Sequence, residues 1–463
     1  MLFTIAFRNI LRTKRRSLMT LLAIAVGGIA LVLFGEFVAF VKVGLETNAV
    51  QNVGHLTVYR TGYFDYGAGN PAAFGIGNYE QVARAIAADP EIEPTLNLVT
   101  PTVSLTGIAG NFDIDASKTF LGTGYVPSDR DRMLRWDEHG VSRHRVFGDS
   151  GLSDGDETRG VVGVGLARVL GLCEKLKIAD CPPRPSLTSA TATTSAPADL
   201  PSLAAEGDAT SDLHGDAPRL DLLAATASGA PNVMSLYVSH AEPQGARELD
   251  ENVVVMNFSL AQKLLYGRGE RKAVGLVLQL HHTADIEPVR ARLTQLFKDH
   301  NWDLEVRDFA EREPFYRQAV GMFNAIFLFI SLIMGVIVLF TVVNTMGMSV
   351  VERTNEIGTS RAMGVRRGGI RQLFVAEGAM LGALGATAGV LAGQALATLF
   401  NRMGATWTPP GQAAPRPLEV LTSDVHGLLL GAWIGLVVMA TVAAVVPANR
   451  AAQLKVVDAL RHI

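Results

Sequence analysis

Four long apolar stretches constrain the fold of this chain more than any other feature. They cover residues 17–40, 321–351, 378–401 and 425–449, and the last three contain no Asp, Glu, Lys or Arg. About 20 apolar residues in a helix cross the hydrocarbon core of a bilayer, whereas core helices of soluble domains are usually shorter and amphipathic. Each stretch is therefore predicted to be a transmembrane helix, and a single soluble globule is excluded.

The composition excludes several other classes of protein. Only 18% of the 463 residues are charged, below the roughly 25% of soluble domains, and the formal net charge is -3. The high apolar content excludes a disordered chain. Two cysteines in this length exclude a small domain held together by disulfides. The balanced charge argues against a nucleic-acid partner.

The distribution of basic residues predicts the orientation of the spans. Residues 1–16, the link at 352–371 and the tail at 448–463 together carry a net charge of +10, and the rest of the chain carries -13. Basic loops stay on the cytoplasmic side. We therefore expect both termini and the link in the cytoplasm. The first apolar run is too long for a signal peptide, and we expect a retained anchor.

These observations divide the chain into consecutive segments. We predict a cytoplasmic amphipathic helix at 1–16, spans at 17–40, 316–351, 372–401 and 425–447, a cytoplasmic loop at 352–371, an outer loop at 402–424 and a tail at 448–463. Residues 1–16 are alternatively only the basic flank of the first span. As a helix, the 31 residues of the second apolar stretch would span about 46 Å, against a hydrocarbon core of about 30 Å. Its outer end is expected to form a stalk, and tilt within the bilayer is the alternative.

The outer region between the first two spans alternates short strands and helices. This pattern, in residues 41–110 and 231–315, predicts an α+β domain. The predicted fold is therefore an α-helical membrane protein with four transmembrane helices, one before and three after a large extracytoplasmic α+β domain. In an oxidising compartment Cys173 and Cys181 would form a disulfide, and two free thiols are the alternative.

Glycines spaced four residues apart mark the last two spans. Such spacing lets helix backbones approach closely in lipid. The glycines are Gly378, Gly382, Gly385, Gly389, Gly393, Gly427, Gly431 and Gly435. Packing within the chain and packing across a dimer both remain open.

The cytoplasmic link is rich in charge and contains two glycines. Residues 352–361 predict a short helix, with Gly358 and Gly364 as break points, and Ile357 and Met363 available for burial. A helix that docks on a cytoplasmic partner and a solvated loop that only sets topology are equally favoured by these residues.

The motif E-R-T-x-E-I-G-x-x-R-A-x-G, which begins at Glu352, resembles the inner loop of MacB/FtsX-type ABC transporter permeases, the group that includes the LolC/LolE pair. The opening at 6–16, the stretch at 371–378 and the tail at 447–461 are also similar to this family. In the tail, Val456 stands where the family usually has a second proline.

The resemblance implies one span, an external domain and three further spans, with the link as a coupling helix on a cytoplasmic ABC ATPase subunit. It implies a small β-rich insertion, which we place at 111–230, with a disordered loop at about 182–229. The coupling residues carried over by the motif are Glu352, Arg353, Thr354, Glu356, Ile357, Gly358, Arg361, Ala362 and Gly364.

The sequence itself contains no G-x-x-x-x-G-K-[ST] pattern, so we expect ATP and Mg to be bound by a separate ATPase chain. We assign no catalytic residue, no metal site and no cofactor to this chain, and we do not expect an enzyme. His281, His282 and Asp285 are too weak a signal for a metal. One coupling loop per chain implies a second permease chain, as a homodimer or a heterodimer.

The resemblance favours a permease subunit that transmits ATP-driven motion to its external domain for lipoprotein or lipid release or export. The alternative is an FtsX-like signalling protein that activates an external partner such as a cell-wall hydrolase, and a passive scaffold is a third possibility. Membrane lipids and a periplasmic carrier or adaptor are further expected partners. The expected location is the bacterial inner membrane, with the large domain in the periplasm.

Overall fold

The computed structural model describes residues 6–456 except 7, 11, 13, 68, 142–149, 179–180, 182–216, 245–246, 268, 409–415, 424 and 455. The chain divides into two compact units. We call them the helical unit (Met1–Gly44, Arg317–Trp407 and Pro417–Ile463) and the sheet unit (Leu45–Tyr316 and Thr408–Arg416).

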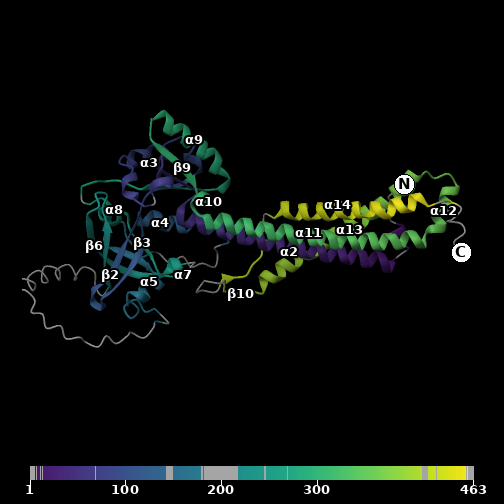
Figure 1. Ribbon diagram of the computed structural model, residues 1–463, viewed down its shortest axis with the longest axis horizontal. Coiled ribbons are helices and arrows are strands. Elements are labelled where there is room, and N and C mark those ends of the chain that lie inside the picture. Colours follow the sequence, from purple (N-terminus) through teal and green to yellow (C-terminus); the bar gives the residue numbers. More distant parts are fainter. Residues whose placement is uncertain are drawn as a thin grey trace, which may run out of the picture. The chain divides into compact units, whose positions relative to one another are not determined.

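Four helices in the described chain are long and apolar enough to cross a membrane (Figure 1). They are α2 (Lys14–Val53), α11 (Pro314–Glu352), α13 (Arg367–Arg402) and α14 (His426–Gln453). A short helix, α12 (Thr354–Ala362), lies between α11 and α13, and the strands β10 (Thr406–Trp407) and β11 (Arg416–Pro417) pair between α13 and α14. All four predicted spans therefore lie within long apolar helices.

Both α2 and α11 extend well beyond their apolar stretches, at 40 and 39 residues. The sequence predicted an extension only for α11. Residues 41–53 continue α2 because they contain no proline and only one glycine. The helix ends where Gly54 adopts a φ of +71°, a backbone conformation that favours glycine.

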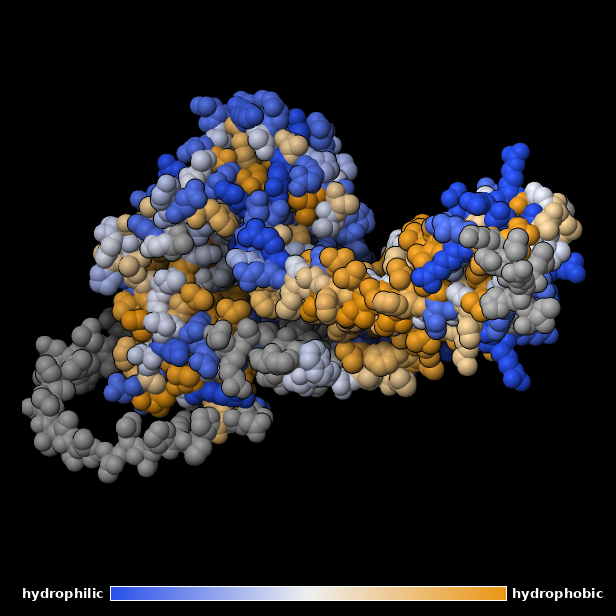
Figure 2. All heavy atoms as spheres, turned by 45° about the vertical axis from the view of Figure 1, so that its right-hand side comes forward, coloured by the Kyte–Doolittle hydropathy of each residue, from blue (hydrophilic) through white to orange (hydrophobic). Residues whose placement is uncertain are grey.

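The surface of the helical unit is strongly apolar, as Figure 2 shows. On α11 alone, large side chains such as Leu328, Phe329, Leu332 and Phe340 are more than 60% exposed. A soluble protein rarely exposes a continuous apolar surface of this extent. This surface is therefore suited to contact with lipid.

Helix α13 packs closely against both α14 and α2 along its glycines. A methyl group added at Gly378 or Gly382 would lie within 3 Å of alanine side chains on α14. One added at Gly385, Gly389 or Gly393 would lie within 3 Å of atoms of α2. The predicted close approach of helix backbones thus occurs within the chain at these five glycines.

The glycines of α14 do not take part in this packing. A methyl group added at Gly427, Gly431 or Gly435 would meet no atom of the described chain within 4 Å. These three residues lie on a face of α14 that no described helix covers, so packing across a dimer stays a prediction for them.

The sheet unit is built on a nine-stranded sheet with the order β3-β7-β4-β6-β5-β2-β8-β1-β9. The strands are β1 (Leu56–Arg60), β2 (Leu96–Asn111), β3 (Ala116–Tyr125), β4 (Arg159–Gly163), β5 (Arg219–Ala225), β6 (Pro231–Glu242), β7 (Val253–Asn257), β8 (Gly275–Leu280) and β9 (Leu304–Asp308). Its helices are α3 (Tyr79–Ala87), α4 (Pro127–Leu134), α5 (Val164–Val169), α7 (Arg247–Asp250), α8 (Phe258–Tyr266), α9 (Ile286–Asp299) and α10 (Phe309–Arg312). Short turns of other helix types are η1 (Tyr63–Gly67), η2 (Pro71–Phe74), η3 (Glu93–Thr95), η4 (Phe112–Ile114) and η6 (Thr283–Asp285).

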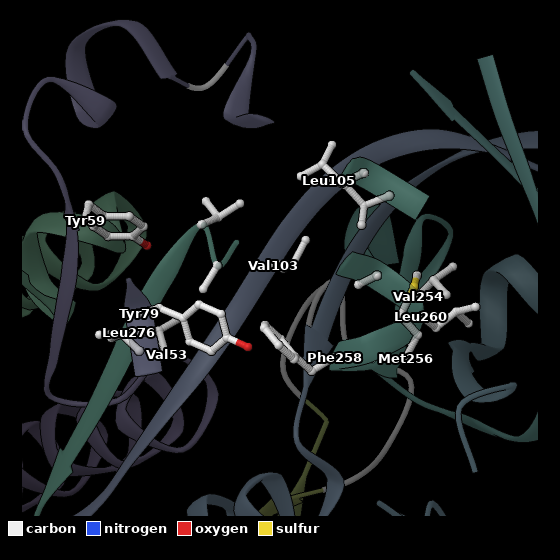
Figure 3. Packing of buried hydrophobic residues seen from close by; sticks show 14 of the residues in the cluster. Val53, Tyr59, Tyr79, Val103, Leu105, Val254, Met256, Phe258, Leu260 and Leu276 are labelled. Atoms are coloured by element: carbon white, nitrogen blue, oxygen red, sulfur yellow. The ribbon is translucent and has the colours of Figure 1, made fainter. Parts of the chain in front are cut away.

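Strand β2 joins the two halves of this sheet. Its first residues pair with β8 and its last residues pair with β3 and β5. Buried side chains on both sides of this strand belong to one core, as Figure 3 shows for Val103 and Leu105 beside Val254 and Met256 of β7. The core continues to α3, where the ring of Tyr79 packs edge-on against Phe258 at 5.6 Å.

The predicted boundaries of the β-rich insertion are wrong in two places. Residues 219–225, placed in the disordered loop at 182–229, form β5. Strands β6 and β7, placed in the α+β domain at 231–315, pair with β5, β4 and β3. The Ala- and Ser-rich sequence around β5 hid the alternation of buried residues that forms it. Residues 182–216 lie outside the described part of the chain.

Cys173 and Cys181, which follow α5, are joined by a disulfide with Cα atoms 6.3 Å apart. Of the two alternatives for this pair, the structure therefore contains the disulfide.

We predict that Gly389→Val destabilises the helical unit and that Gly431→Val does not. A Cβ at 389 would lie 2.7 Å from the carbonyl oxygen of Ala25, whereas position 431 is open. Overpacking of this kind costs about 1–3 kcal/mol. Thermal unfolding of the purified chain in detergent measures the difference, and equal unfolding midpoints for the two variants would contradict the assigned packing.

His55, between α2 and β1, is buried and hydrogen-bonded. Its Nδ1 accepts the backbone N–H of Leu280 at 2.9 Å, and its ring lies edge-on to Trp136 at 4.8 Å. Burial lowers the pKa of His55 from 6.5 to about 4, against the attraction of Glu138, which raises it. The neutral ring is therefore the form that this packing requires.

We predict that the sheet unit loses stability in acid through His55. The unfolded chain takes up the proton near pH 6.5, and the folded chain only near pH 4, so stability falls as the pH drops through this interval, by up to about 3 kcal/mol. Thermal unfolding at several pH values should show a flatter acid limb in His55→Gln. His282→Gln, at an exposed histidine, should keep the limb of the parent chain.

Candidate functional site

The motif that begins at Glu352 forms an elbow followed by a short helix. α11 ends at Glu352, Arg353 departs from helical geometry, and α12 runs from Thr354 to Ala362. Gly364, with a φ of +98°, turns the chain toward α13, as predicted. The break predicted at Gly358 is wrong, because this glycine lies inside α12 and is buried. A glycine within a helix costs only about 1 kcal/mol, which close packing can offset.

Arg353 holds the elbow against α13. Its Nη1 donates to Glu377 Oε1 at 3.0 Å and its Nε donates to Glu356 Oε2 at 3.2 Å. Its guanidinium also lies 5.6 Å from the centre of the Phe374 ring. The Glu377 side chain is only 7% exposed, and Asn9 donates a second hydrogen bond to it. This nearly buried carboxylate is therefore fully partnered from two directions.

The N-terminal residues bind the acidic residues of the motif. Arg12 pairs with Glu356 at 2.6 Å, and Arg16 forms a two-pronged pair with Glu352. Partial burial alone would raise the pKa of Glu356, but hydrogen bonds from Arg353 and Arg12 outweigh it and keep that pKa below its usual value. The carboxylates of Glu352 and Glu356 are thus paired with arginines of the same chain.

Three further motif residues also face inward. Ile357 is buried in the core of the helical unit together with Ile370 and Phe374. Gly358 is buried beside it, and Arg361 donates to the carbonyl oxygen of Ala452 at the end of α14 at 2.9 Å. The prediction that Ile357 is available to a partner is therefore wrong.

The outward surface of this segment, which we call the elbow tip, consists of different residues. Its exposed members are Asn355, Thr359, Ala362, Met363, Gly364, Val365, Arg366 and Arg367. Met363 is 76% exposed. The sequence motif named Ala362 and Gly364 but missed the others. Helical spacing would have found Asn355, Thr359 and Ala362, which recur at three- and four-residue intervals on one face.

The described chain contains no candidate metal centre. Among its residues, no group of three or more His, Cys, Asp or Glu side chains is placed to hold a metal ion. His282 instead pairs with Glu138 at 3.1 Å.

The region that contains the elbow matches a known family. The model of the FtsX-like permease C-terminal domain matches residues 328–456, which include most of α11 and all of α12, α13 and α14. The chain is also 33% identical over 144 residues to the macrolide export ATP-binding/permease protein MacB 1/2 of Paracoccus denitrificans, a match that covers 31% of this chain and 19% of that protein. These matches support a MacB/FtsX-type ABC transporter permease family for this chain.

Two further relatives agree with this assignment. The permease is 25% identical over 236 residues to the uncharacterized ABC transporter permease MJ1507 of Methanocaldococcus jannaschii, covering 47% of this chain and 53% of the relative. It is 27% identical over 235 residues to the probable syringafactin export ATP-binding/permease protein SyfD of Pseudomonas syringae, a match that covers 50% of this chain and 30% of that protein. The permease thus spans about half or less of the relatives that it matches.

We predict that the Arg353–Glu377 pair keeps Ile357 buried. In the permease with Ile357→Cys the thiol should react slowly, and with Met363→Cys it should react fast. Adding Glu377→Ala leaves Arg353 without its nearly buried partner, a loss that typically costs 3–5 kcal/mol, and should expose Cys at 357.

Glu352→Ala is the matched control for that experiment. It removes the more exposed pair with Arg16, and such pairs contribute about 0–1 kcal/mol. The protection of Cys at 357 should remain. Equal labelling after Glu352→Ala and Glu377→Ala would show that the pair does not hold the elbow.

Proposed function

We propose that this permease docks on a separate cytoplasmic ABC ATPase through the elbow tip and transmits the motion of that ATPase to its own sheet unit. The observation that carries this proposal is a contrast between α12 and the turn that follows it. The inner side of α12 is fixed by ion pairs and buried contacts, whereas residues 363–367 expose a methionine, a valine and two arginines. A helix that is held firmly in the chain and is followed by exposed apolar and basic residues is suited to bind the ATPase and to transmit its motion.

The exposed residues indicate the chemistry of the partner surface. Met363 and Val365 would fill an apolar groove, and Arg366 and Arg367 would face acidic groups at its rim. ATP and Mg are bound by that ATPase in this proposal, and the permease supplies no nucleotide contact. Since transport ATPases act in pairs, two permease chains would present two elbow tips.

Two helices offer a route for the motion. α11 leads directly from the elbow to residue 314 in the sheet unit, and α2 leads from Arg16 to Val53. A continuous helix resists bending, so displacement at one end reaches the other. We place the elbow and both termini in the cytoplasm and the sheet unit in the periplasm. The disulfide between Cys173 and Cys181 supports an oxidising location for the sheet unit.

The substrate that we propose is a lipoprotein, a lipid or another amphiphilic compound that is released or exported. The printed names of two relatives support outward transport, since they describe the export of macrolides and of syringafactin. Motion that passes through α2 and α11 would reach the outer domain, which would then act on the substrate at the membrane surface.

We predict that Met363→Glu abolishes co-purification of the ATPase with the permease. The substitution places a charge in the middle of the apolar part of the elbow tip, while the 76% exposure of Met363 means that folding is unaffected. The measurement is the amount of ATPase retained on affinity-purified permease from detergent-solubilised membranes, and the ATP turnover of the retained complex.

Met403→Glu is the control, because Met403 is another exposed methionine, at the opposite end of α13. It should retain the ATPase. If Met363→Glu and Met403→Glu retain the ATPase equally, the elbow tip is not the docking surface.

A further inference from the structure

Glu36 is a buried acid inside the helical unit that the proposed coupling mechanism does not use. Its side chain lies within the first predicted span on α2 and has no exposed surface. Neither carboxylate oxygen has a hydrogen-bond partner among the residues that the structure describes. A carboxylate in a membrane span is costly unless it is paired, so such a residue demands a functional explanation.

The residue next to Glu36 is tightly packed. A methyl group on the neighbouring Gly35 would lie 2.8 Å from Leu428 of α14 and 3.1 Å from Phe327 of α11. The contacts of α2 with α13 advance in steps of four residues, from Gly28 beside Gly389 to Val32 beside Gly393. The next step places the buried Ala397 opposite Glu36.

An irregular segment of backbone closes this region. Residues 420–422, which we call the outer strap, precede α14 and are bound by three neighbouring residues. The Asn401 side chain makes two hydrogen bonds with the backbone of Val420, of 2.8 and 3.0 Å. The N–H of Leu421 donates to the backbone oxygen of Glu36 at 3.2 Å.

The outer strap reaches well below the end of α13. Gln394 Nε2 donates to the carbonyl oxygen of Thr422 at 3.4 Å, and Gln394 lies eight residues before the last residue of α13, about 12 Å along the helix. The other side-chain atom of Gln394, Oε1, is buried and has no partner in the described chain. Irregular backbone at this depth is tolerated only where protein or water satisfies it.

The backbone of Glu36 and the side chain of Gln394 therefore bind the same strap, and the side chains of these two residues carry three oxygen atoms that are unpartnered in the described chain. Oxygen atoms without donors attract a cation or a proton. Metal cations such as Ca²⁺ take about six to eight oxygen ligands, more than this set supplies. A proton needs one oxygen, and it removes the charge that makes the burial costly.

We propose that Glu36 is a proton-binding site that controls the docking of the outer strap. With the strap docked, Glu36 is a neutral carboxylic acid. When the strap leaves and water enters, the O–H bond breaks, the proton passes to water and a hydrated carboxylate remains. Proton binding and strap docking are therefore linked, so that each favours the other.

The titratable groups on the neighbouring segments do not supply a counter-ion. They are Lys42 on α2 itself, Arg402 at the end of α13, and Glu419 and His426 on either side of the outer strap. Lys42 donates to Asn324 of α11 at 3.3 Å. None of them forms an ion pair with Glu36 in the described chain.

The experiment places a cysteine reporter in the outer strap by Val420→Cys, because Val420 is buried. A second reporter, Trp407→Cys, occupies an exposed position and corrects for the effect of pH on thiol reactivity. The purified chain in lipid nanodiscs is labelled with a small thiol reagent from about pH 6 to about pH 9, without reductant. The proposal predicts that the labelling ratio of 420 to 407 rises with pH, by up to about tenfold per pH unit, the limit for one linked proton.

Glu36→Gln keeps the shape of the side chain but carries no ionisable proton, so the ratio should stay low at every pH. Glu419→Gln is the matched control, since Glu419 is another acid directly before the outer strap, and the pH response should survive. A ratio that is flat in the parent chain, or that rises equally in Glu36→Gln, overturns the proposal.

Infrared spectroscopy of the chain without reporter cysteines tests the proposal even if the cysteine variants fail to fold. The carbonyl stretch of a protonated carboxylic acid should be present at neutral pH and missing in Glu36→Gln. Its presence in both chains, or its absence from both, also overturns the proposal. Neither measurement needs the ATPase, so the outcome is independent of the coupling function.

Discussion

The helical unit depends on the close approach of three helix backbones along α13. Because glycine replaces larger residues wherever α13 meets α2 or α14, the three axes come near enough for backbone atoms to touch, as where Gly28 faces Gly389. Lipid gives no hydrophobic drive for helices to associate, so this van der Waals contact is the main source of cohesion available. It also fixes the relative height of α2 and α13, and this height brings Asn9 and Arg16 of the N-terminal region to the level of Glu377 and the elbow.

The elbow shows how one charged motif serves two purposes. Its acids and two of its arginines are consumed by contacts within the chain: Arg353 with Glu377, Arg12 with Glu356, and Arg361 with the end of α14. These contacts join the elbow to α13, to α14 and to the N-terminal segment, and they fix its position in the helical unit. The exposed elbow tip contains apolar residues, Asn355, Thr359 and the exposed Arg366 and Arg367.

The sequence predicted those parts of the structure that follow from local periodicity. The four spans and the alternation of short strands and helices in the outer region occur where expected. Features decided by long-range packing were missed. Nothing in the chain near Ile357 shows that Phe374 and Ile370 will cover it, and Gly427 has the same spacing as Gly389 although nothing lies against it. Strand β5 was missed because its partners, β2 and β6, satisfy a sequence that is weakly strand-forming alone.

The contacts at both ends of α2 suit this helix to a mechanical role as well as to anchoring the chain in the membrane. In the sheet unit, Arg312 of α10 donates to the carbonyl oxygen of Val53 at 3.0 Å and to Thr57 at 2.7 Å, immediately before α11 begins. The end of α2 and the start of α11 are therefore fastened to each other there, and Arg16 with Glu352 fastens the same two helices at the elbow. Two helices joined at both ends can slide only a little along each other. In the proposed mechanism, motion that enters at α12 would move them as a pair, and Glu36 lies on α2 between the two fastened ends.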